Sequence, residues 1–247
     1  MRPFIYNRRI MLLILAASSA LLYAADFILL GDFKELTIWF LGNLAFLPLY
    51  VIFVTMILER VLRERERQAV LRKLNMVIGV FFSEVGNRLL RELSSCINGG
   101  EDLKLHLLVR ANWKEQEYQV ALRFLDTTDI TVDSAACDKA VVEEFLLSKR
   151  NFLVGLLENQ NLLEHEAFTD LLWAVFHLSE ELEARPNYEG LPKSDIDHLN
   201  GDIKRVFDSL SRQWLLYMQH LQTDYPYLFS LAIRMNPMVE NPDPKVY

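Results

Sequence analysis

The feature that most constrains this sequence is an apolar run from Leu36 to Leu58, "LTIWFLGNLAFLPLYVIFVTMIL", which contains no charged residue. A helix that crosses a lipid bilayer needs about 20 consecutive, mostly apolar residues. A second apolar run, from Ile10 to Leu30, carries Asp26 as its only charge. Together the two runs predict an N-terminal hairpin of two transmembrane helices, with spans at about 10–30 and 36–58.

A cleaved signal peptide is the alternative interpretation of the first run. The opening "MRPFIYNRR" has the character of a basic n-region, and "SSA" at residues 18–20 resembles a cleavage site. The apolar stretch continues past that site, however, and Leu22 stands where a small residue is preferred. These two observations favour a membrane span.

Basic residues lie on both outer flanks of the predicted hairpin. They are Arg2, Arg8 and Arg9 before the first span, and Arg60, Arg63, Arg65, Arg67, Arg72 and Lys73 after the second. Because positively charged flanks stay on the cytoplasmic side, both termini should be cytoplasmic, with the hairpin in the inner (plasma) membrane. Arg60, Arg63 and Arg67 are expected to contact anionic lipid headgroups.

The predicted external turn, "GDFKE", limits what the hairpin can do. It is too short for a ligand-binding domain or for the re-entrant filter of a potassium-type channel. Within the spans, Asp26 and Asn43 are candidate functional residues, because polar groups in lipid are costly and often line ion pathways. The alternative is that Asp26 reaches water at the interface and Asn43 hydrogen-bonds between helices. Pro48 is expected only to bend the second helix.

Charge is distributed unevenly along the chain. Residues 1–75 hold ten Lys and Arg against six Asp and Glu, whereas residues 76–247 hold sixteen against twenty-seven. Nucleic-acid binding needs clustered Lys and Arg to contact phosphates. The acidic body of the chain therefore argues against a nucleic-acid partner.

The second span is predicted to continue as a basic helical stalk over residues 59–75. Apolar residues at 57, 61, 71, 78, 82, 85 and 89 lie on a grid that steps alternately by four and three and that Glu64, Gln68 and Asn75 interrupt. This spacing is typical of a short coiled-coil seam. With Gly42 and Ala45 permitting close helix approach in the span, the seam predicts self-association into a homo-oligomer.

Residues 76–235 are predicted to form a cytoplasmic α-helical domain, so that the fold class is all-α. Segments such as "HEAFTDLLWAVFHLSEELEA" are amphipathic at helical spacing. Ser194 and Asp197 predict a capping box at the start of the helix that Tyr225–Pro226 ends. The connector 126–136 contains "ITV", which could form a very short strand, but nothing nearby would pair with it. Residues 236–247 are a Pro-rich tail with no core-forming content.

The sequence contains none of the common catalytic or phosphate-binding motifs, such as GxxxxGK[ST], GxSxG, CxxC or HExxH. We therefore expect no catalytic residues and no cofactor. Cys96 and Cys137 are isolated, and in a cytoplasmic domain they are expected to be free thiols.

Two groups of carboxylates and histidines are candidates for a metal site. They are His177 with Glu180 and Glu181, and Asp195 with His198. Helical bundles build di-metal sites from Glu-x-x-His elements, and this sequence contains no such element. Acid-rich helix faces are usually solvated, so no metal site is expected.

Three segments, "FFSEVGNRLL", "LPKSDIDHLNGDIKRVF" and "HLQTDYPYLFSLAIRMNP", resemble a group of uncharacterised bacterial membrane proteins with the same two-helix start. The resemblance covers most of the predicted cytoplasmic domain. It implies one architecture and brings no activity or site residues with it.

Two functional hypotheses follow from these patterns. The first is a non-enzymatic, membrane-anchored oligomeric scaffold or interaction module whose acidic domain docks a cytoplasmic protein partner. The alternative is a small oligomeric ion channel or transport-associated subunit in which Asp26 and Asn43 face a shared pore.

Overall fold

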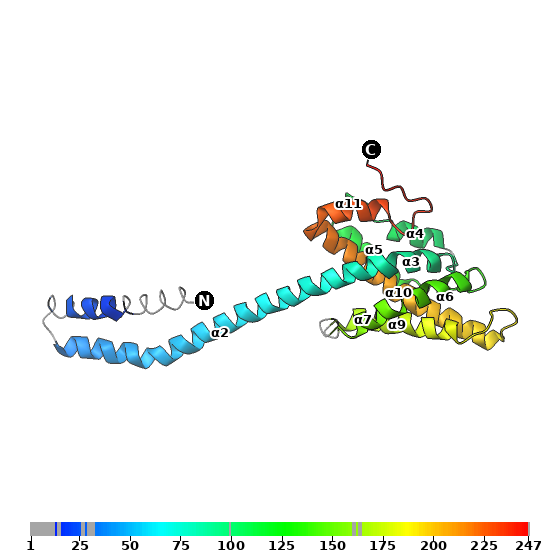
Figure 1. The fold of residues 1–247 in the computed structure, drawn as a ribbon. Helices are drawn as coiled ribbons and strands as arrows, with labels where there is room; N and C mark the ends of the chain where they lie inside the picture. Colours follow the sequence, from blue (N-terminus) through cyan, green and yellow to red (C-terminus); the bar gives the residue numbers. More distant parts are fainter. Residues whose placement is uncertain are drawn as a thin grey trace. The chain divides into compact units, whose positions relative to one another are not determined.

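The computed structural model describes Leu13, residues 16–25, Ile28 and residues 33–98, 100–159, 162 and 165–246. The described residues form helices and no β-strand, which confirms the all-α prediction (Figure 1). The chain divides into two compact units, unit 1 from Met1 to Arg67 and unit 2 from Gln68 to Tyr247.

Unit 1 contains most of the apolar helix α2 (Phe33–Phe81), which passes through Pro48 and ends in unit 2. Its stretch Thr37–Arg67 is the one helix among the described residues that is long and apolar enough to cross a membrane. A shorter apolar helix covers Ala16–Ala25, and its Tyr23 contacts Phe40 edge-to-face with ring centroids 6.1 Å apart. The predicted hairpin of two spans is therefore not supported by the structure, because the described part of 10–30 is too short to span. The remainder of that predicted span lies outside the described residues.

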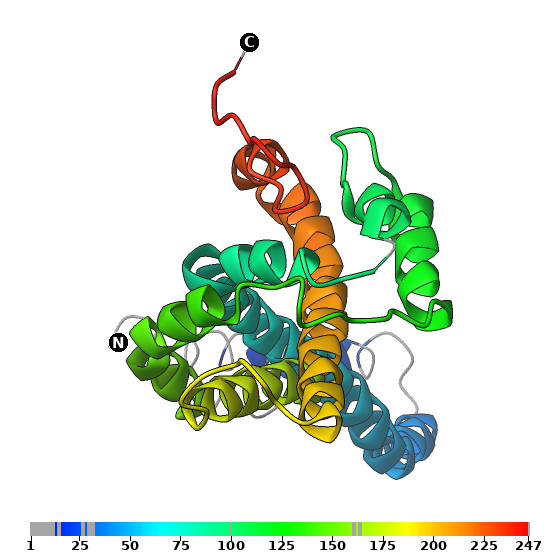
Figure 2. The same cartoon turned by 90° about the vertical axis from the view of Figure 1, so that its right-hand side faces the viewer.

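Unit 2 is built around its longest helix, α10 (Lys193–Asp224). Helices α9, α5, α11 and α3 contact α10, as Figure 2 shows. The other elements of the unit are η1 (Phe82–Gly86), α3 (Asn87–Ser94), α4 (Gly100–Leu107), α5 (Glu115–Thr127), α6 (Lys139–Ser148), α7 (Arg150–Leu157), α9 (Glu166–Glu183) and α11 (Pro226–Arg234).

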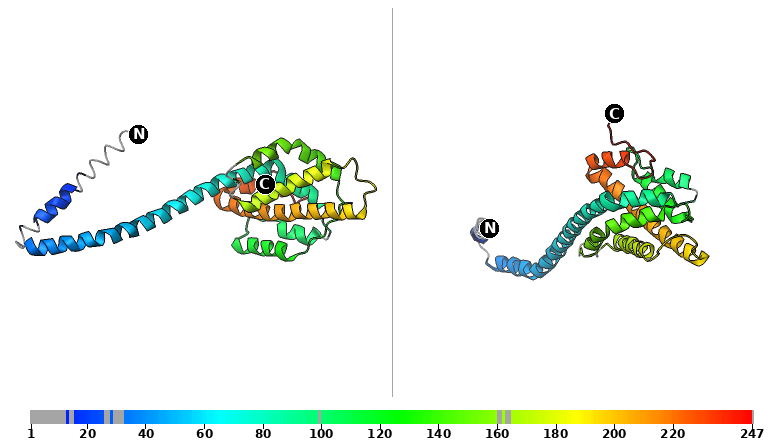
Figure 3. Two further views of the ribbon diagram at one scale, coloured as in Figure 1. Left: turned by 90° about the horizontal axis from the view of Figure 1, so that it is seen from below. Right: turned by 45° about the vertical axis from the view of Figure 1, so that its right-hand side comes forward.

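The core of unit 2 forms because apolar residues recur at three- and four-residue steps along facing helices. Along α10 these buried residues are Leu199, Ile203, Val206, Phe207, Leu210, Trp214, Met218 and Leu221. Along α9 they are Phe168, Leu171, Leu172, Val175, Leu178 and Leu182. The two helices lie side by side and are joined by a single loop (Figure 3), so these two apolar faces pack together.

The predicted seam divides between the two units. Ile78, Phe82, Val85 and Leu89 are buried in the core of unit 2. Ile57 and Val61, in contrast, remain 48% and 44% exposed in unit 1. Packing within the chain thus explains the described seam residues beyond residue 71. Only Ile57 and Val61 remain available to contact a partner.

A disulfide joins Cys96 and Cys137, so the prediction of two free thiols is wrong. The connector 126–136 causes this pairing, because it runs beside the C-terminal end of α3. Ile97 and Val132 form an isolated antiparallel bridge, and the Asp133 N–H donates to the Cys96 carbonyl at 2.9 Å. The "ITV" segment therefore has a pairing partner after all, and it brings the two Cα atoms to 4.9 Å.

Two local predictions are also corrected. Pro192, not Ser194, is the N-cap of α10, and no side chain caps that helix. The tail is anchored at its start, because Asn236 and Met238 are buried. The Asn236 side chain donates to the Leu107 carbonyl at 3.2 Å and accepts from the Met238 N–H at 2.8 Å.

Candidate functional site

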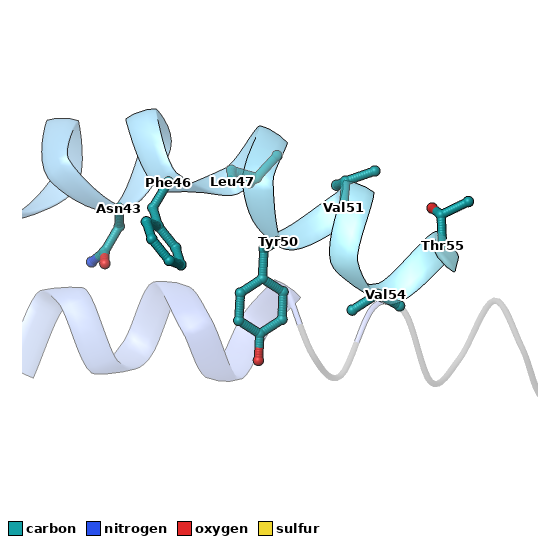
Figure 4. Close-up of a pocket in the computed structure, with 7 residues that line it drawn as sticks. All are labelled: Asn43, Phe46, Leu47, Tyr50, Val51, Val54 and Thr55. Atoms are coloured by element: carbon teal, nitrogen blue, oxygen red, sulfur yellow. The ribbon is translucent and has the colours of Figure 1, made fainter. Parts of the chain in front are cut away.

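The predicted intramembrane site can be followed only in part. Asn43 lies in the apolar stretch of α2, where its side chain is exposed and lines an open hollow along the helix (Figure 4). The other residues that line the hollow are Phe46, Leu47, Tyr50, Val51, Val54 and Thr55. Asp26 lies outside the described residues, so the hypothesis that Asp26 and Asn43 face a shared pore stays a prediction.

The three predicted headgroup residues lie at the C-terminal end of the stretch Thr37–Arg67, on one side of α2. Arg60, Arg63 and Arg67 line a shallow surface together with Met56, Glu59 and Glu64. Their three- and four-residue spacing explains this, because such residues share one face of a helix. Arg63 also forms an exposed ion pair with Glu59 at 3.2 Å. The side chains are therefore placed to act together at one surface.

Unit 2 brings together a second polar group, on the facing surfaces of α9 and α10. It consists of His177 and Glu181 from α9 with His198 and Asp202 from α10, and we call it the His–carboxylate cluster. Each helix contributes a histidine and, four residues later, a carboxylate, so that each pair lies on one helix face. One ligand-type atom from each residue lies within 4.8 Å of the other three.

Asp202 is the buried floor of this cluster, with a side chain that is 3% exposed. Its Oδ1 atom accepts from Arg205 at 3.1 Å, while its Oδ2 atom has no hydrogen-bond partner. Oδ2 faces the Nε2 atoms of His198 and His177, at 3.3 and 3.6 Å. A buried carboxylate oxygen without a partner is costly, and it makes this point of the surface attractive to a cation.

Arg185 stabilises the rim of the cluster. Its guanidinium donates to Glu181 at 2.8 Å and makes a two-pronged contact with Asp195 at 2.6 and 3.0 Å. Hydrogen bonds and charge attraction from Arg185 hold the pKa of Glu181 and the pKa of Asp195 below their ordinary values. Glu181 is therefore a carboxylate at neutral pH, and the ion pairs fix the α9–α10 loop beside it.

The candidate groups predicted from sequence are only partly those that the structure assembles. His177, Glu181 and His198 meet, but Asp195 is taken by Arg185, and Glu180 lies near Arg150 at 3.9 Å. Asp202 was missed, although the sequence signal for it exists. That signal is a His-x₃-carboxylate spacing on both helices. Residues four apart share one helix face, as residues three apart do.

Two family profiles match the chain. "MJ1433, N-terminal helical domain" matches residues 4–62, and "Uncharacterized protein MJ1433, C-terminal helical domain" matches residues 70–234. The chain is 41% identical over 234 residues to "Uncharacterized protein MJ1433" of Methanocaldococcus jannaschii, a match that covers 94% of each chain. No solved structure matches the chain. This relative is archaeal, which corrects the expected likeness to a bacterial group.

Proposed function

The chain belongs to the MJ1433 family, and we propose that it is a non-enzymatic membrane-anchored protein that holds its helical domain at the bilayer surface. One observation carries the proposal. The most apolar 18-residue window of the stretch Thr37–Arg67 has a mean hydropathy of 2.1, and none of this window is buried within the chain. Monomeric soluble proteins rarely expose an apolar surface of more than about 300–600 Å². A bilayer is the environment that suits a helix that is apolar on every side.

The finer topology is part of this proposal. In it the first span of a two-span hairpin would contain the short apolar helix Ala16–Ala25, whose Tyr23 contacts Phe40 of α2. The basic flanks, which include Arg60, Arg63 and Arg67, favour cytoplasmic termini at an inner (plasma) membrane. In this arrangement the acidic unit 2 docks a cytoplasmic protein partner.

Alkaline carbonate extraction of native membranes tests the anchoring. The full chain should stay in the membrane pellet, whereas the variant L47R/V51R should be released. Arginine at the centre of a span costs about 2.5–3.5 kcal/mol per residue on the insertion scale. The matched control is L105R/V120R, which places two arginines at exposed apolar positions of unit 2 and should stay in the pellet.

Each outcome of this experiment decides between interpretations. Release of the unmodified chain would overturn membrane anchoring. Retention of L47R/V51R would show that a segment other than Thr37–Arg67, such as the proposed first span, also holds the chain, and would overturn α2 as the sole anchor. Release of the control as well would point to general misfolding, which the helical circular-dichroism signal of the extracted protein detects.

Self-association through α2 is the second part of the proposal. Ile57 and Val61 are exposed in unit 1 and lie four residues apart, so they form a short stripe at the cytoplasmic end of the proposed span. Mass photometry in nanodiscs should find more than one chain per particle, and Val61→Asp should reduce the number. Leu62→Asp, which places the same charge one position off the stripe, is the control. A monomer that Val61→Asp leaves unchanged would exclude this interface.

The alternative function, a small oligomeric ion channel or transport-associated subunit, uses the same anchor. Asn43 in the hollow of Figure 4 is the observation in its favour. Proteoliposomes separate the two functions, because a channel would pass ions and Asp26→Ala would reduce the flux. A scaffold would pass none.

A further inference from the structure

The His–carboxylate cluster is unrelated to the membrane anchor and requires a separate explanation. Its four residues come from two helices of unit 2 joined by one loop, so both pairs are held by the packed core beneath them. His177 is 43% exposed, His198 51% and Glu181 25%, whereas Asp202 is buried. Solvent can therefore reach three of the residues, and the fourth forms the floor.

The distances between the four groups fit one bound metal ion. Zinc binds histidine nitrogen and carboxylate oxygen at about 2.0–2.2 Å, so the corners of a tetrahedron around it lie about 3.3–3.6 Å apart. Asp202 Oδ2 lies 3.3 Å from His198 Nε2 and 3.6 Å from His177 Nε2. The two oxygens of Glu181 each face one imidazole, with Oε2 at 3.6 Å from His198 Nε2 and Oε1 at 3.8 Å from His177 Nε2. Small rotations of the exposed side chains would bring the most distant pair, within 4.8 Å, to the same range.

Asp202 Oδ2 is the second, independent observation that points to a cation. This atom is buried, lacks a hydrogen-bond partner and faces both imidazoles. Arg205 holds the other oxygen of the same carboxylate, and Arg185 holds Glu181. Such contacts to ligands orient them in known metal sites, where they form the outer shell.

We propose that His177, Glu181, His198 and Asp202 bind one divalent transition-metal ion of the zinc type, which links α9 to α10. Two imidazoles with two carboxylates form a nitrogen–oxygen donor set that suits zinc. Four protein ligands leave no open position, which is the arrangement of structural zinc sites. Both cysteines are in the disulfide, so a thiolate site is not an alternative.

The competing explanation is an ion-pair network in which the histidines are protonated and bind no metal. Zinc titration of the metal-stripped full chain in detergent separates the two, with bound zinc counted by mass spectrometry after gel filtration. Cobalt(II) is a second probe, because tetrahedral coordination gives it a visible absorption band. This band should disappear when zinc displaces the cobalt from the site. We expect one zinc per chain.

The variants are chosen so that misfolding cannot imitate the result. Asp202→Asn keeps the size of the buried floor but removes its charge, and His198→Ala changes a half-exposed side chain. Each should weaken zinc binding by more than about 100-fold, since loss of an outer-shell contact alone costs about 10–100-fold. Circular dichroism should show unchanged helix content for His198→Ala, which keeps the test valid if Asp202→Asn fails to fold.

The matched control comes from the same helix. His220 and Asp224 repeat the His-x₃-Asp spacing on α10, with Nδ1 and Oδ2 2.8 Å apart. Among the described residues, however, no third His, Cys, Asp or Glu joins this pair to form a possible metal site. His220→Ala should leave zinc binding unchanged. Binding of no zinc by the full chain would overturn the proposal, as would Asp202→Asn and His198→Ala proteins that bind like the unmodified chain. Equal loss in His220→Ala would mean nonspecific binding by surface histidines and would also overturn it.

Discussion

The apolar stretch of α2 and helix α10 are both long helices rich in large apolar residues, yet their surroundings are opposite. In Thr37–Arg67 the most apolar window is entirely exposed within the chain. In α10 the apolar residues recur at three- and four-residue steps, and nearly all of them are buried against α9, α5 and α3. Polar residues occupy the rest of the α10 surface, including His198 of the His–carboxylate cluster.

The difference teaches that periodicity, rather than apolar content, decides where a helix goes. A helix with one apolar face needs a partner on one side and water on the other, which a globular core supplies. A helix that is apolar on all sides has no face to turn to water, so only a nonaqueous environment suits it. The two units of this chain should therefore respond in opposite ways to the same kind of substitution.

The largest expected effect is the contrast between Trp214→Ala and Phe46→Ala. Trp214 is 1% exposed in the core, and its truncation should lower the free energy of unfolding of unit 2 by about 3–5 kcal/mol. Phe46 is exposed in α2, so Phe46→Ala should change the same quantity by less than about 0.5 kcal/mol. Denaturant titration of the full chain in detergent, followed by circular dichroism, measures both. Equal losses would show that the stretch of α2 around Phe46 also contributes to the core of unit 2, and the contrast would fail.

Removal of the disulfide is next in size. The bridge closes a loop between residues 41 apart, and loops of this kind stabilise a fold by about 2–4 kcal/mol through the unfolded state. Cys96→Ser with Cys137→Ser should lower the free energy of unfolding of unit 2 by about that amount. A reducing agent should have the same effect on the unmodified chain and none on the double variant, which is the control.

Alkylation checks the pairing directly. Mass spectrometry should find no alkylated cysteine in the unreduced protein and two after reduction and unfolding. Two alkylated cysteines without reduction would restore the prediction of free thiols. Disulfides persist mainly in oxidising compartments, with intracellular proteins of some archaea as an exception. The same measurement on cells therefore also bears on the side of the membrane on which unit 2 lies.

The sequence predicted the elements that depend on local signals. Amphipathic spacing predicted α9, and Tyr225–Pro226 predicted the end of α10, whose last residue is Asp224. What it could not predict depends on segments that meet only in the folded chain. Cys96 and Cys137 pair because the connector at Val132 bridges to Ile97.

The candidate site was predictable to a similar extent. The types of residue were correct, because His177, Glu181 and His198 were recognised as possible ligands. The complete set of residues was not predicted. The packing of α9 on α10 brings Asp202 to the other three residues, whereas Asp195 is bound by Arg185 instead. The anchoring of the tail by Asn236 was likewise hidden, since its acceptor, the Leu107 carbonyl, lies 129 residues away.

A smaller effect is expected at Gly86, the last residue of η1 in the core of unit 2. A Cβ atom added at Gly86 would lie 2.5 Å from Phe82, whose ring stacks on Tyr217 at 5.0 Å. Gly86→Ala should therefore cost about 1–3 kcal/mol of stability through overpacking. Gly155→Ala in α7, where nothing lies within 4 Å, should instead stabilise the chain by about 0.5–1 kcal/mol. Thermal unfolding of both variants measures the contrast. A stabilising Gly86→Ala would show that η1 is loosely packed.

The smallest expected effect concerns how helices begin in the two units. The apolar stretch of α2 lies inside one long helix, whereas in unit 2 the helices α6 and α9 start at side-chain caps and α10 does not. The Asp138 carboxylate accepts from the Val141 N–H at 3.2 Å and caps α6, so Asp138→Ala should cost about 1 kcal/mol. Ser194 makes no such contact, because α10 begins at Lys193 after Pro192, and Ser194→Ala should change stability by less than about 0.5 kcal/mol. Denaturant midpoints of the two variants give the comparison, and a loss at Ser194 as large as that at Asp138 would restore the capping box that the sequence predicts.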